Sequence, residues 1–160
     1  MFDQILDLPA HPLIIHFAVV LTPLLAAVCA AYALVPRWRP YLGWAVVLLA
    51  LATPGAVFAA KQSGESLKAA RFADADGALG ARIATHQSFA NPLLLSVLGL
   101  AAAALLLVYA TRPGRGATGD HRFGRPVTLA LSGLTLVLAA VAGYFVFRAG
   151  DSGARAVWSL

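Results

Sequence analysis

The chain has 160 residues, of which 60% are hydrophobic and 12% charged, and its formal net charge is +5. Soluble domains are about half apolar and about a quarter charged, so this composition excludes an ordinary soluble domain and indicates a membrane protein. The basic excess does not indicate a nucleic-acid partner, because the sequence has no basic stripe with interleaved aromatic residues.

Four apolar runs are each long enough to cross a bilayer, which takes about 20 residues in a helix. Lipid offers no partner to backbone N–H and C=O groups, so these runs are expected to be helical. The sequence therefore predicts an all-α, four-helix transmembrane bundle of up-down topology, in a single membrane domain over 1–160. The predicted spans are 12–35, 42–60, 90–110 and 127–147.

The first span opens on two histidines, in HPLIIHF. His11 precedes Pro12, which suits the first turn of a helix, and is expected at the hydrated interface. His16 lies about 7.5 Å deeper along a helix, where an unpartnered polar group is penalised. We therefore expect His16, rather than His11, to bind a ligand. Further along, Thr22 precedes Pro23, which is expected to kink the helix.

The second span contains another kinking pair, Thr53-Pro54, and ends in FAAKQSG, which includes Lys61. Gly64 is expected to end this helix in the left-handed conformation. A loop is predicted over 61–89, with a short surface helix over 65–72 that includes Glu65.

The third span is opened by His86 and runs in the same direction as the first, so the two histidine-bearing ends share one membrane face. The end of the second span returns Lys61 and Glu65 to that face. Titratable groups near hydrocarbon are costly and mark candidate functional sites. This face therefore carries the predicted site.

The fourth span ends in FRAGDSG, which matches FAAKQSG at Phe, Ala, Ser and Gly. Gly153 is expected to end its helix, as Gly64 does. Duplication of a helical hairpin explains the match, and chance similarity between apolar segments is the alternative.

Charge predicts the orientation. The loops after spans one and three carry six arginines and one aspartate, whereas the opposite face carries six basic and six acidic residues. Short basic loops favour the cytoplasmic side. We expect both termini and the histidines outside.

The segments LPAHPLIIHFAVVLTP, SGESL and FRAGDSGARAVW, with the histidine that opens span three, resemble the four-helix bacterial membrane proteins grouped as DUF2231. The resemblance covers most of the chain and implies the architecture more than an activity. Some relatives look fused to Rieske-type iron–sulfur domains, which implies redox work and a redox partner protein.

Three functions remain open. In the first, His16 and His86 ligate one haem b for electron transfer, and Arg82 or Lys61 pairs with its propionates. In the second, the protein binds a divalent transition metal. The candidate metal ligands are His11, His16, Glu65 and His86.

In the third, the protein is a non-catalytic membrane subunit or anchor for a partner protein, and its small-residue faces suit close helix packing or a homo-oligomer. The sequence shows no nucleophile–base arrangement and no phosphate loop, so no hydrolase or transferase is predicted. The enzymatic role that stays open is a redox role.

Overall fold

The computed structural model describes residues 4–5, 8–112 and 123–158. Two short strands, β1 (Gln4–Ile5) and β2 (Leu8–Pro9), pair antiparallel ahead of the first helix. The helices that follow are α1 (Ala10–Leu34), the 3-10 turn η1 (Pro36–Trp38), α2 (Arg39–Arg71), α3 (Gly77–Ser88), α4 (Ala90–Thr111) and α5 (Gly124–Trp158). The predicted all-α bundle is confirmed.

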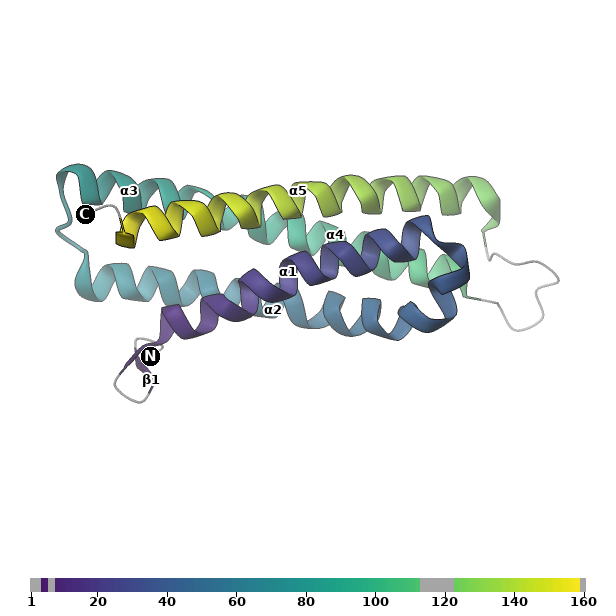
Figure 1. Cartoon of the computed structure of the whole chain (residues 1–160), viewed down its shortest axis with the longest axis horizontal. Coiled ribbons are helices and arrows are strands. Elements are labelled where there is room, and N and C mark those ends of the chain that lie inside the picture. Colours follow the sequence, from purple (N-terminus) through teal and green to yellow (C-terminus); the bar gives the residue numbers. More distant parts are fainter. Residues whose placement is uncertain (1–3, 6–7, 113–122, 159–160) are drawn as a thin grey trace.

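The four long helices lie lengthwise, and the chain reverses direction at η1 and again between α2 and α3 (Figure 1). Helix α1 packs on α2 and α5, and α4 packs on the same two helices, so α1 and α4 are diagonal partners. The start of α1 and the end of α5 lie at the end of the bundle that carries the α2–α3 turn (Figure 1).

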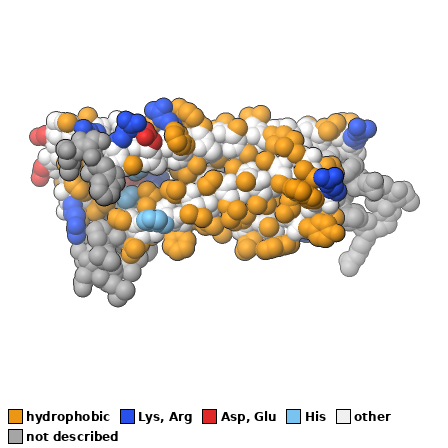
Figure 2. All heavy atoms as spheres, viewed as in Figure 1, with side chains coloured by type: hydrophobic (Ala, Val, Ile, Leu, Met, Phe, Trp, Pro, Cys, Tyr) orange, Lys and Arg blue, Asp and Glu red, His pale blue; other side chains and the backbone are white. Residues whose placement is uncertain are grey.

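The bundle surface is that of a membrane protein. All four of its long helical segments are long and apolar enough to cross a bilayer. Figure 2 shows hydrophobic side chains along the middle of the visible face, with basic groups at both ends and acidic groups at one end. Lipid contact is therefore expected along the length of the helices. The most exposed large hydrophobic side chains include Phe17, Leu34, Leu51, Leu95 and Phe147.

The connection between the second and third spans differs from the prediction. Helix α2 continues to Arg71 and α3 begins at Gly77, so most of the predicted loop over 61–89 is helical. The predicted surface helix over 65–72 is largely the last turns of α2. An ion pair between Lys61 and Glu65, 2.6 Å apart and one helical turn from each other, stabilises this continuation.

The predicted helix ends at Gly64 and Gly153 are wrong. Both glycines lie inside helices, α2 and α5, because neither is followed by a residue that breaks a helix. Among the described residues, the glycines with positive φ are Gly77 at 60° and Gly124 at 77°, and both begin helices.

The bundle has two halves, α1 with α2 and α4 with α5, and positions that are buried in the first half are also buried in the second. The two members of each pair are separated by one constant number of residues between α1 and α4, and by another constant number between α2 and α5. This match extends the short FAAKQSG and FRAGDSG repeat over whole helices, which favours duplication of a hairpin over chance similarity. The matched buried pairs are Ala18 and Leu93, Leu25 and Leu100, Cys29 and Ala104, Tyr32 and Leu107, Val46 and Thr135, Ala50 and Ala139, and Val57 and Val146.

Candidate functional site

The first histidine of the chain lies in the interface between α1 and α2. His11 is partly buried, and its Nδ1 lies 3.0 Å from the carbonyl oxygen of Ala60 and 3.0 Å from Oγ of Ser63. Ser63 Oγ donates to the same carbonyl at 3.0 Å. Since a carbonyl only accepts, Nδ1 of His11 carries the proton, and Nε2 carries the lone pair.

His86 has the same environment in the second half of the bundle. Its Nδ1 lies 3.2 Å from Oγ of Ser152 on α5, and Ser152 donates to the carbonyl of Ala149 at 3.1 Å. The hydroxyl proton of Ser152 is already used, so Nδ1 of His86 donates and its Nε2 carries the lone pair.

The two imidazoles lie beside each other. The centroids of the His11 and His86 rings are 6.4 Å apart, and the ring planes are 73° from parallel. His11 comes from α1 and is fixed by α2, whereas His86 comes from α3 and is fixed by α5. The two halves of the bundle therefore bring two histidines with matching hydrogen-bond partners to one place.

A glycine lies against each ring. A Cβ atom on Gly64 would lie 3.0 Å from Cε1 of His11, and one on Gly153 would lie 3.1 Å from Cε1 of His86. Contacts this short are tighter than nine in ten of those that real Cβ atoms make, so glycine allows each ring to lie directly against its neighbouring helix. The paired serines and glycines of the sequence repeat thus form the two histidine environments.

The amino-acid sequence agrees with this architecture. The model of one protein family, described as predicted membrane protein (DUF2231), matches residues 7–160. The chain belongs to the DUF2231 family. No curated protein and no solved structure matches it.

His16 lies elsewhere in this DUF2231 protein. Its side chain is exposed on α1, and its Nδ1 hydrogen-bonds to the carbonyl oxygen of Pro12 in the same helix. We expected His16 beside His86, and the structure places His11 there instead. The reason is helical phase, because His11 faces α2 whereas His16, five residues on, faces outward.

The four metal-ligand candidates are not brought together either. Glu65 is exposed and ion-paired with Lys61, and His16 is bonded within its own helix. Within the ranges that the structure describes, no three His, Cys, Asp or Glu side chains form a group fit to hold a metal ion. His11 and His86 of the DUF2231 bundle thus form a pair, and His16 and Glu65 lie apart from it.

Basic and aromatic groups surround this end of the bundle. Lys68 on α2 donates to Gln87 on α3 at 2.8 Å, and Arg148 on α5 lies 5.0 Å from the ring centroid of Phe89. Arg82 is half-buried on α3. Histidine and acidic atoms lie toward one end of the face in Figure 2.

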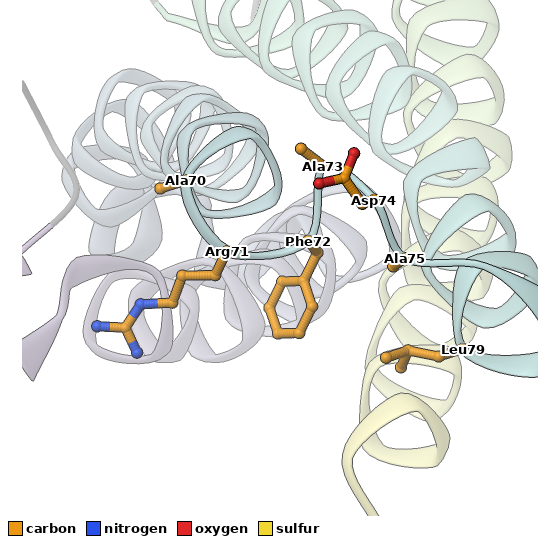
Figure 3. A pocket seen from close by; sticks show the side chains of 7 residues that line it. All are labelled: Ala70, Arg71, Phe72, Ala73, Asp74, Ala75 and Leu79. Carbon is orange, nitrogen blue, oxygen red and sulfur yellow. The ribbon is translucent and has the colours of Figure 1, made fainter.

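A separate hollow lies at the α2–α3 turn (Figure 3). Its lining comes from one continuous stretch, 70–79, and neither histidine contributes to it. Figure 3 shows the side chains of Arg71, Phe72 and Leu79 around this turn. This hollow belongs to the turn and not to the paired histidines.

Proposed function

We propose that this protein binds one haem b, whose iron His11 and His86 would hold, and that it transfers electrons in the membrane. The observation that carries the proposal is the pair of imidazoles at 6.4 Å, each held through Nδ1 by a neighbouring helix. Histidine ligands of metals characteristically donate their other ring N–H to a carbonyl or similar acceptor.

The number of donors favours haem over a bare metal ion. Structural zinc takes four protein ligands and catalytic zinc three, whereas haem iron takes its remaining one or two ligands from the protein. The described residues offer two imidazoles here and no third donor. Two imidazoles are enough protein ligands for haem iron but too few for a bare divalent ion.

The spacing of the rings also fits. The ring centroids are 6.4 Å apart, close enough for the two imidazoles to hold one ligand in common. Each Nε2 carries its lone pair and makes no hydrogen bond among those found in the described residues.

Bound haem supplies a one-electron couple. His11 and His86 would hold the iron, while Ser63 and Ser152 fix the tautomer and the orientation of the two rings. Arg82 at the same end of the bundle would supply positive charge for the propionates, as would Lys61 on leaving its ion pair with Glu65.

An absorption spectrum of the full chain, purified in mild detergent from cells supplied with haem, tests the proposal. We expect a Soret band and, on reduction, the sharp visible bands of a low-spin haem, at one haem per chain. A chain without a Soret band contradicts the proposal. Metal analysis of the same sample then separates a bare-metal protein from a membrane subunit without a cofactor.

Replacing the serines tests their role in orienting the rings. Removing the acceptor that orients a ligating histidine typically costs about 10–100-fold in metal affinity. We expect Ser152→Ala to weaken haem binding more than Ser63→Ala, because His11 keeps its direct bond to Ala60 at 3.0 Å. Haem titration of the apoprotein and the midpoint potential measure the effect. Ser96→Ala, which loses only a bond to Leu93 in its own helix, is the control.

We further infer that the histidines face the exterior of a bacterial inner membrane, because the described residues at the opposite end include four arginines and no acid: Arg37, Arg39, Arg112 and Arg125. In a Cys29→Ser chain, an impermeant maleimide added to intact cells is expected to label Ala73→Cys in the α2–α3 turn and not Arg37→Cys in η1. Both positions are exposed. Labelling of Arg37→Cys alone would reverse the orientation.

A further inference from the structure

Two threonine hydroxyls in the middle of the bundle have no hydrogen-bond partner. Thr22 on α1 and Thr53 on α2 are both 0% exposed, and their Oγ1 atoms make no hydrogen bond among the described residues. The other described helical threonines each donate to the carbonyl four residues earlier: Thr85, Thr111, Thr128 and Thr135. The hydroxyls of Thr22 and Thr53 are therefore available to a partner outside their own helices.

The two threonines lie at the same level of the α1–α2 interface. Two contacts fix the antiparallel register of these helices, one near each end: His11 with Gly64, and Tyr32 with Gly43. Thr22 follows His11 by eleven residues, and Thr53 precedes Gly64 by eleven residues. Since both helices rise equally per residue, the two hydroxyls lie opposite each other, about halfway along the interface.

Each threonine precedes a proline inside its helix, Pro23 in α1 and Pro54 in α2. Proline has no N–H, so the carbonyls four residues earlier, at Val19 and Ala50, lack their usual helical donor. Ala50 is buried, so this level of the interface combines two unpaired hydroxyls with one under-satisfied carbonyl, whereas Val19 and Pro23 are exposed on the outer side of α1. The hydrocarbon of a bilayer cannot satisfy any of these polar groups.

The second hairpin lacks this arrangement. The positions that match Thr22 and Thr53 in the repeated burial pattern are Val97 and Ala142, both buried, and neither is followed by proline. The fold therefore does not require hydroxyls at this level. Their presence in the first hairpin calls for a separate explanation.

We propose that Thr22 and Thr53 together bind an ordered water molecule at the centre of the α1–α2 interface. Water both donates and accepts, and buried waters make two to four hydrogen bonds to groups left unsatisfied by the protein. A cation fits less well, because every acid in the described ranges lies at the histidine end of the bundle: Glu65, Asp74, Asp76 and Asp151. The site is independent of the haem proposal.

A double-mutant cycle tests whether the hydroxyls act together. We expect Thr22→Val and Thr53→Val each to lower the thermal unfolding midpoint of the detergent-solubilised chain by several degrees, and the double variant to fall no further than the lower single one. Thr135→Val is the control, since Thr135 is equally buried but donates to Leu131 at 2.8 Å in its own helix. It is expected not to couple with Thr53→Val.

Water contact is measured directly by nuclear Overhauser transfer from water to the methyl groups of the two threonines. We expect transfer to both methyls in the unaltered chain and loss at the remaining threonine in either single variant. Two outcomes overturn the proposal: absence of transfer in the unaltered chain, or single variants that raise the unfolding midpoint additively. The second is what hydroxyls without any partner would give, because valine removes an unsatisfied group.

Discussion

Replacing either paired histidine is expected to abolish stoichiometric haem binding. His11→Ala and His86→Ala each remove one of the two imidazoles that lie 6.4 Å apart, and no other described His, Cys, Asp or Glu completes the group. The loss should exceed the roughly 10–100-fold that removal of a ligand's orienting partner causes. The height of the Soret band per chain, measured after purification from haem-supplied cells, is expected to fall below about a tenth of its unaltered value.

His16→Ala is the matched control, because it removes an imidazole from the same helix. The side chain of His16 is exposed, and its ring bonds within its own helix, so the variant is expected to keep its haem. If His16→Ala lost haem while His11→Ala kept it, the ligand assignment would move to the deeper histidine. Size-exclusion profiles in detergent separate loss of a ligand from loss of the fold.

The architecture follows from hydropathy alone. Apolar runs of about 20 residues must form helices in lipid, and four such runs in one short chain leave few arrangements other than a bundle. Hydropathy determines the ends of the helices less well, because an apolar run stops at the membrane surface whereas helical hydrogen bonding continues beyond it. Helix α2 therefore continues past its apolar run to Arg71, through a segment that is polar and helix-favouring.

The site was predictable only in part. That histidines from spans one and three share one end follows from topology, and FAAKQSG with FRAGDSG contains the serines and glycines that surround them. The choice between His11 and His16 depends on which side of α1 faces α2. Helix α1 is apolar all round, so its sequence carries no clear amphipathic phase from which that side can be read. Depth along the helix does not determine that side.

Adding a methyl group beside either ring is expected to weaken haem binding. In Gly64→Ala the new Cβ would lie 3.0 Å from Cε1 of His11 and 3.3 Å from its Nδ1, and in Gly153→Ala it would lie 3.1 Å and 3.3 Å from the same atoms of His86. Each ring must move by a few tenths of an ångström, out of the position fixed by its serine. We expect affinity to fall about 3–10-fold with alanine, and binding to be lost with valine.

Two other glycines in the same helices provide matched controls for the contact between the added methyl group and the histidine ring. A Cβ on Gly55 of α2 or on Gly150 of α5 would meet no atom within 4 Å. All four alanine substitutions raise helix propensity, by about 1 kcal/mol each, so none is expected to lower the unfolding midpoint through the backbone. Haem titration should therefore separate Gly64→Ala and Gly153→Ala from Gly55→Ala and Gly150→Ala, even where thermal stability does not. Equal haem affinity in all four variants would show that the glycines are not needed to hold the histidine rings, and the proposed ligand geometry would fail with them.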